Sequence, residues 1–130
     1  MSTSDNQMFV RRFLAAISGT DKAAPLLDEY VSTDAAALRA EIALYESAFA
    51  RFELIPDVLI AGDTVVAVRA RLCGTHTGSV LGQAPTQHPI NIRVSMSYRI
   101  VGGKIVGHRF QPDVLSLLQQ IGLLPNAGLS

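Results

Sequence analysis

The chain has 130 residues, of which 48% are hydrophobic, and its 11 basic residues balance its 11 acidic ones. This length is typical of one domain, so we expect a single domain over residues 1–130. A chain without net charge has no general attraction for nucleic acids or anionic membranes, and no apolar stretch reaches the roughly 18 residues of a membrane span. Because Cys73 is the only cysteine, an intramolecular disulfide is excluded, and we expect a cytoplasmic protein.

The first half of the sequence has the spacing of helices. Phe9, Phe13 and Ile17 recur at helical intervals, and Ser4 or Asp5 is the expected cap of this first helix. A short second helix is expected from Pro25, since proline is favoured at the first helical position.

A third helix is expected after Asp34, its predicted N-cap. Leu38, Ile42, Tyr45 and Phe49 give this helix an apolar face. We interpret most aromatic residues of the helices as core. A buried tyrosine hydroxyl usually finds a partner, so Tyr45 is a candidate for ligand contact.

The second half alternates with the period of strands, and a stretch rich in Gly, Pro and Thr at residues 74–89 is expected to be a loop or irregular hairpin. Helices followed by antiparallel strands predict an α+β fold, because parallel folds alternate the two kinds of element. A curved sheet around helices encloses a pocket. The expected strands are residues 52–60 interrupted at Pro56, 64–72, 90–100 and 104–111, the last ended by Pro112 and followed by a helix from Val114.

Four segments of the second half occur in a distinctive order. They are Ala61-Gly62-Asp63-Thr64-Val65, Gly74-Thr75-His76-Thr77-Gly78, Gly103-Lys104-Ile105-Val106-Gly107-His108 and Asp113-Val114-Leu115-Ser116-Leu117-Leu118-Gln119-Gln120-Ile121-Gly122.

In this order and spacing they resemble the SnoaL-like polyketide cyclase family of the nuclear-transport-factor-2-like superfamily, from about Ala48 to Pro125. The resemblance implies a cone-shaped, curved antiparallel sheet wrapped around N-terminal helices. It also implies ring closure by intramolecular aldol condensation without metal or cofactor, and a homodimer.

The resemblance assigns the general acid/base to Asp113. A carboxylate that faces an apolar cavity would have a raised pKa, because desolvation disfavours its charged form, and it would exchange protons near neutral pH. The alternative is that Asp113 caps the terminal helix, where it would be solvated and ionised.

Four further residues are candidate ligand contacts in the second half. Arg109 stands where the family usually has an aromatic residue, and regular alternation would put Arg109 and Gln111 on the same side as Asp113. Arg109 would then pair with Asp113 and lower its pKa; the alternative is an arginine on the outer face. His76 and His108 are also candidates, as is Phe13 in the first helix. His76, His88 and His108 lie in separate segments without nearby carboxylates, so no metal site is expected.

Three functions remain open from the sequence. The first is a cofactor-free enzyme for a hydrophobic keto substrate, with isomerase and hydrolase chemistry fitting as well as cyclisation. The second is a module that binds a small hydrophobic ligand, and the third is a dimerisation domain. None of them requires a nucleic acid or a membrane.

Overall fold

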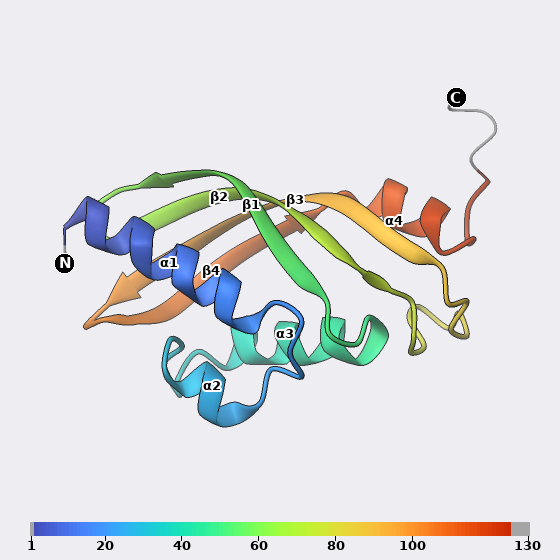
Figure 1. The fold of residues 1–130 in the computed structure, drawn as a ribbon, viewed down its shortest axis with the longest axis horizontal. Helices are drawn as coiled ribbons and strands as arrows, with labels where there is room; N and C mark the ends of the chain where they lie inside the picture. The colour runs from blue at the N-terminus through green and yellow to red at the C-terminus, as the bar shows by residue number, and fades with distance from the viewer. Residues whose placement is uncertain (1, 126–130) are drawn as a thin grey trace.

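The computed structural model describes residues 2–125. Three helices come first, four strands follow and a short helix ends the described chain, as Figure 1 shows. This order confirms the expected α+β fold. The elements are α1 (Thr3–Ile17), α2 (Ala24–Asp28), α3 (Ala36–Ala48), β1 (Glu53–Ala61), β2 (Val65–Thr75), β3 (Pro89–Val101), β4 (Lys104–Pro112) and α4 (Val114–Gln120).

The four strands form one antiparallel sheet in the order β1-β2-β3-β4. Strand β1 continues through Pro56 with a shift of register between Pro56 and Val58, where the sequence suggests a break. The sheet curves, and α1, α2 and α3 lie on its inner side in Figure 1. No helix among the described residues is long and apolar enough to cross a membrane.

Alternating burial explains why β2 and β3 form the centre of the sheet. Every second residue points to the helices and is buried, while the residues between are mainly exposed. Each large apolar side chain buried in this way stabilises the fold by about 1.5–3 kcal/mol. The inner residues are Val66, Val68, Ala70 and Leu72 from β2, and Ile90, Ile92, Val94, Met96, Tyr98 and Ile100 from β3.

The helix caps differ from the expected ones. Helix α1 is capped by Ser2, which forms a reciprocal capping box with Asp5. Asp34 does not cap α3, because that helix begins after Ala35 and has no side-chain cap. Helix α1 is fixed further by Asn6, whose amide donates to the carbonyls of Gly62 and Asp63 at 3.1 and 2.8 Å.

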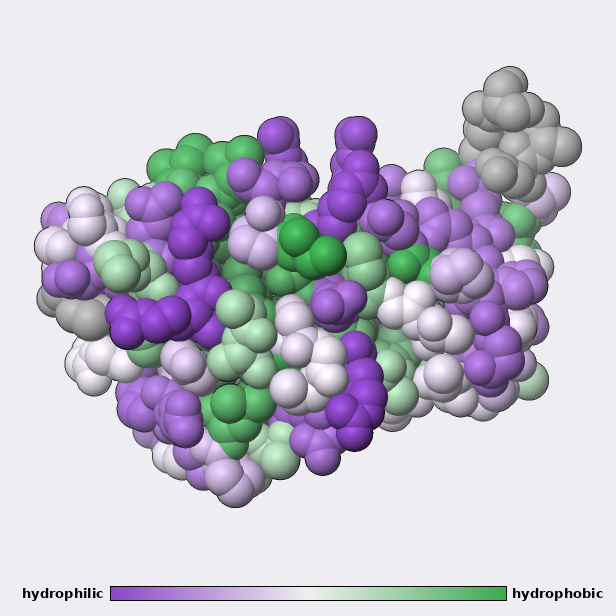
Figure 2. All heavy atoms as spheres, viewed as in Figure 1, coloured by the Kyte–Doolittle hydropathy of each residue, from purple (hydrophilic) through white to green (hydrophobic). Residues whose placement is uncertain are grey.

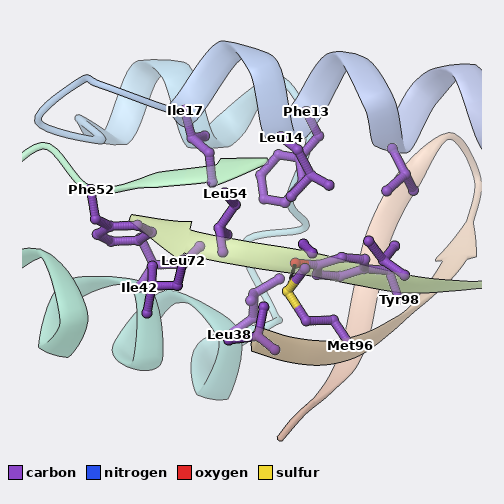
Figure 3. Packing of buried hydrophobic residues seen from close by; sticks show 14 of the residues in the cluster. Phe13, Leu14, Ile17, Leu38, Ile42, Phe52, Leu54, Leu72, Met96 and Tyr98 are labelled. Carbon is purple, nitrogen blue, oxygen red and sulfur yellow. Dashed lines mark hydrogen bonds between the residues drawn. The ribbon is translucent and has the colours of Figure 1, made fainter. Parts of the chain in front are cut away.

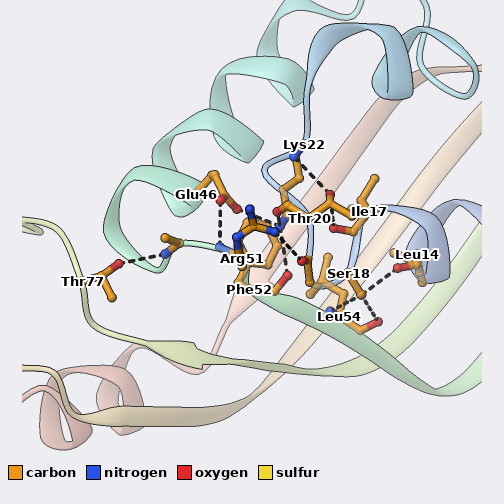
Figure 4. Close-up of polar contacts among 12 residues, drawn as sticks. Leu14, Ile17, Ser18, Thr20, Lys22, Glu46, Arg51, Phe52, Leu54 and Thr77 are labelled. Atoms are coloured by element: carbon orange, nitrogen blue, oxygen red, sulfur yellow. Dashed lines mark hydrogen bonds and ion pairs between the residues drawn. The ribbon is translucent and has the colours of Figure 1, made fainter.

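A buried ion pair attaches the C-terminal half of α3 to the α1–α2 loop. Lys22 Nζ lies 2.7 Å from Glu46 Oε1 and donates to the carbonyls of Thr20 and Phe52 at 2.8 and 3.0 Å, as Figure 4 shows. The ammonium also lies over the Phe52 ring, 3.9 Å from its centroid. Burial lowers the pKa of Lys22, and Glu46 opposes that shift. These contacts hold α3 in place over the inner face of the sheet.

Candidate functional site

An apolar cavity of about 30 Å³ lies between α3 and the inner face of the sheet. This is room for one or two water molecules. Figure 3 shows Leu38 and Ile42 of α3 facing Leu72 and Met96 of the sheet. The lining residues are Leu38, Glu41, Ile42 and Tyr45 from α3, with Phe52, Leu54, Leu72, Met96, Tyr98, His108 and Phe110.

A close contact between a histidine and a carboxylate lies in the wall of this cavity. His108 Nε2 of β4 is 2.6 Å from Glu41 Oε1 of α3, and the two side chains are 12% and 34% exposed. When Nε2–H donates to the carboxylate, the ring of neutral His108 has its lone pair on Nδ1. His108 therefore combines a ring nitrogen that can accept a proton with a carboxylate that holds the ring in place.

Tyr98 of β3 is the second polar group of the cavity. It is the Cα partner of His108 in the β3–β4 register, and side chains opposite each other in this way lie about 5 Å apart at Cβ. Its buried hydroxyl donates to Met96 Sδ at 3.1 Å, and a thioether is a weak acceptor. Burial, assisted by Glu41, raises the pKa of Tyr98, so the hydroxyl stays protonated and can donate a hydrogen bond.

Tyr45 closes one end of the cavity. Its ring packs edge-on against Phe110 with centroids 5.2 Å apart, and it also contacts Phe49 and Phe52. Burial raises the pKa of Tyr45 as well. Within residues 2–125, no hydrogen-bond partner of its hydroxyl is found. A base, a hydroxyl donor and apolar walls together can remove a proton next to a carbonyl group and hold the resulting enolate.

A family model described as SnoaL-like polyketide cyclase matches residues 9–121. The chain belongs to the SnoaL-like polyketide cyclase family. No curated protein sequence matches it.

Solved structures with the same fold extend this comparison. AclR from Streptomyces galilaeus, a candidate hydroxylase, has a TM-score of 0.81 at 22% identity, covering 96% of this chain and 85% of its own. A candidate SnoaL-like polyketide cyclase from Jannaschia sp. CCS1 has a TM-score of 0.79 at 19% identity, covering 95% of each chain. IdmH from Streptomyces antibioticus, a candidate polyketide cyclase, has a TM-score of 0.74 at 19% identity, covering 94% of this chain and 99% of its own. At these identities the likeness shows the SnoaL-like fold.

Asp113 lies outside the cavity of this SnoaL-like domain. It is exposed and caps α4, where Oδ1 accepts from the Ser116 backbone N–H at 3.1 Å and Oδ2 from the Ser116 hydroxyl at 2.8 Å. These bonds lower the pKa of Asp113, with a small contribution from Arg93. The expected cavity-facing carboxylate with a raised pKa is therefore wrong, and the alternative of a helix cap is confirmed.

Arg109 and Gln111 are exposed on the outer side of the sheet, so the expectation that they line the cavity is also wrong. The reason is a bulge in β4. Arg99 of β3 pairs with Gly107, but the next residue, Ile100, pairs with Ile105, so one extra residue lies between them. Because of this extra residue, His108 and Phe110 lie on the same side of the sheet as the buried Ile105, and Arg109 and Gln111 do not. His108 therefore faces the cavity of the SnoaL-like domain.

The remaining candidates are divided between cavity and core. His108 and Tyr45 line the cavity, and their contact with a ligand stays a prediction. Phe13 is fully buried against Tyr30 and Tyr98 but is not a cavity residue. His76 is also fully buried outside the cavity, where Nδ1 accepts from the Thr86 backbone N–H at 3.2 Å. Among residues 2–125, no three His, Cys, Asp or Glu side chains are grouped to hold a metal ion.

Sequence reasoning missed Glu41 and Tyr98. A signal for Glu41 was present, because Leu38, Glu41, Ile42 and Tyr45 fall on one face of a helix. A carboxylate on an apolar face is unusual, because a charged group that is buried without a partner is costly. Tyr98 alternates with the other inner residues of β3, so no local pattern separates it from the core.

Proposed function

We propose that this SnoaL-like protein catalyses cofactor-free proton transfer on a hydrophobic keto substrate, leading to intramolecular aldol ring closure. His108 acts as the base, Tyr98 donates a hydrogen bond to the carbonyl oxygen, and Glu41 positions His108. The observation that carries the proposal is the contact between His108 and Glu41 at 2.6 Å in the wall of an apolar cavity, opposite Tyr98.

The reaction balances without an added reagent. His108 Nδ1 removes a proton from the carbon next to a carbonyl group, and the electron pair moves to the carbonyl oxygen. The enolate oxygen accepts a hydrogen bond from the Tyr98 hydroxyl, while Glu41 stabilises the imidazolium. The enolate carbon then attacks a second carbonyl carbon of the same molecule and forms the ring bond. The new alkoxide takes the proton back from His108.

The apolar lining supports this assignment of roles. Hydrogen bonds and charges act more strongly where water is excluded, so one hydroxyl donor stabilises an enolate effectively. The cavity of about 30 Å³ is smaller than any substrate with two carbonyl groups, so binding requires side chains of α3 to move outward.

The test uses a hydrophobic diketone whose carbonyl groups are spaced for closure of a six-membered ring. Exchange of its α-protons in heavy water and the rate of ring closure are followed by NMR. We expect the His108→Gln substitution to lower both rates by a factor on the order of 100 to 10,000, the usual contribution of a general base. Arg109→Gln, on the outer side of the same strand, is the matched control and should keep the wild-type rates. Wild-type protein without acceleration, or His108→Gln at full rate, would refute the proposal.

We also propose that the protein forms a homodimer in the cytoplasm. Ile55, Val58, Ile60 and Val65 are 48%, 38%, 68% and 42% exposed on β1 and the start of β2. Figure 2 shows an apolar group at the end of the sheet where these two strands meet. Such a patch is typical of an interface. The Ile60→Glu variant should sediment closer to the 13.9 kDa monomer than the wild type does. A wild type that itself sediments as a monomer would contradict the dimer.

A further inference from the structure

We infer that an apolar hollow between α3, the β2–β3 loop and α4 binds the far end of the ligand, and that Tyr45 separates this hollow from the cavity with His108. The ligand class is an elongated keto compound with an apolar tail. The inference rests on the proposed function for the placement of the carbonyl group, but the hollow itself can be tested by binding alone.

The hollow has the size and lining of a ligand site. Its volume is about 260 Å³, compared with about 30 Å³ for the cavity. Apolar side chains form the wall, and Leu44, Leu81 and Val114 at its rim are 62%, 72% and 49% exposed. The lining residues are Leu44, Tyr45, Ala48, Phe49, Val80, Leu81, Val114 and Leu117.

Tyr45 joins the two spaces because its ring lines both of them. The ring packs against Phe110, which lines the cavity, and against Phe49, which lines the hollow. From Glu41 to Tyr45 the helix α3 rises by about 6 Å, so the hollow begins about one turn from the contact between Glu41 and His108. A ligand with its carbonyl at His108 reaches the hollow once the Tyr45 side chain turns aside.

Leu81 provides an independent observation. It has a φ of 50° and Gly82 a φ of 77°, and Val80 and Gln83 exchange two backbone hydrogen bonds around them. Positive φ at both central residues is typical of a type I′ turn, which favours Asn, Asp or Gly at the first of them. A leucine is unfavourable at this position for two reasons: its backbone has a positive φ, and its apolar side chain is exposed to water. Such an outlier next to an apolar hollow points to a contact with a ligand.

The experiment measures dissociation constants for a series of straight-chain methyl ketones from butanone to undecanone, by NMR titration. For wild-type protein we expect affinity to rise about three- to fourfold for each methylene group that enters the hollow. The Leu81→Asn substitution suits the turn but removes the apolar side chain. It should weaken binding of the longest ketone at least tenfold and leave the shortest ketone unchanged.

Leu115→Asn is the matched control, because Leu115 is 50% exposed on α4 and does not line the hollow. It should bind the whole series as the wild type does. The His108→Gln protein should also keep the dependence on chain length, since that variant loses turnover and not the hollow.

The outcomes separate this inference from the proposed function. Loss of long-chain binding in Leu81→Asn supports the hollow even if no ketone is turned over. Equal affinity of wild type and Leu81→Asn for the longest ketone overturns it even if His108 proves to be the base. A change in sedimentation with unchanged ketone affinity would assign the hollow to a second copy of the chain and overturn the inference as well.

Discussion

The polar residues on the inner side of the sheet differ from those on the outer side in the partners that satisfy them. On the inner side His108 is held by Glu41 and the Tyr98 hydroxyl by Met96, because a buried polar group without a partner is costly. On the outer side Arg93 and Arg109 are exposed, and neither forms an ion pair within residues 2–125. Water can satisfy an exposed group in many orientations, whereas His108 and the Tyr98 hydroxyl are held in fixed ones. Fixed orientation is what proton transfer requires, so we place the chemistry on the inner side.

The Tyr98→Phe substitution tests the inner side most severely. It removes the hydroxyl donor and keeps the ring, so we expect the rate of α-proton exchange to fall on the order of 100-fold, as for other lost oxyanion donors. Because the one hydrogen bond of this hydroxyl within residues 2–125 is to the Met96 sulfur, a weak acceptor, the melting temperature should change little. Full activity in this variant would remove Tyr98 from the mechanism.

The Glu46→Gln substitution tests how much the Lys22–Glu46 ion pair, which holds α3 over the inner side of the sheet, stabilises the fold. It leaves the buried Lys22 ammonium without its carboxylate, and we expect a loss of up to about 3 kcal/mol in the free energy of unfolding, measured with denaturant. Adding Lys22→Met should recover most of that loss. If the double variant is as unstable as Glu46→Gln, the unpaired charge is not the cause.

The Glu41→Gln substitution tests the partner of His108. The amide keeps the shape but cannot stabilise the imidazolium. A hydrogen bond to a charged group contributes about 1.5–3 kcal/mol, so we expect exchange to slow about ten- to a hundredfold. Substrate affinity should stay close to that of the wild type, since Glu41 acts through His108. An unchanged rate would mean that the contact between Glu41 and His108 is only structural.

The smallest effect is expected for Asp113, the exposed cap of α4. The folded state lowers the pKa of Asp113, so its stabilisation is present above the unfolded value near 3.8 and is lost as the pH falls through the lower, folded value. The melting temperature of Asp113→Ala should therefore lie slightly below that of the wild type at neutral pH. The difference should vanish in strong acid, and a constant difference would contradict the assignment as an ionised cap.

The order of helices and strands could be predicted from the sequence, because periodicity is a local property of the chain. The side on which each β4 residue lies could not, since the bulge between Ile105 and Gly107 reverses the alternation and depends on pairing with β3. The partner of His108 could not be predicted from the residues around it either, because Glu41 lies 67 residues earlier in the chain. Only the position of Glu41 on an apolar helix face hinted at it.

In the proposed mechanism His108, and not Asp113, is the base. The most direct test compares α-proton exchange of the hydrophobic diketone by the wild type, His108→Gln and Asp113→Asn, with matched thermal unfolding to confirm folding. We predict that His108→Gln loses at least a hundredfold in rate, whereas Asp113→Asn keeps the wild-type rate because asparagine also caps helices. A rate of α-proton exchange that falls strongly in Asp113→Asn and stays at the wild-type level in His108→Gln would contradict the assignment of His108 as the base.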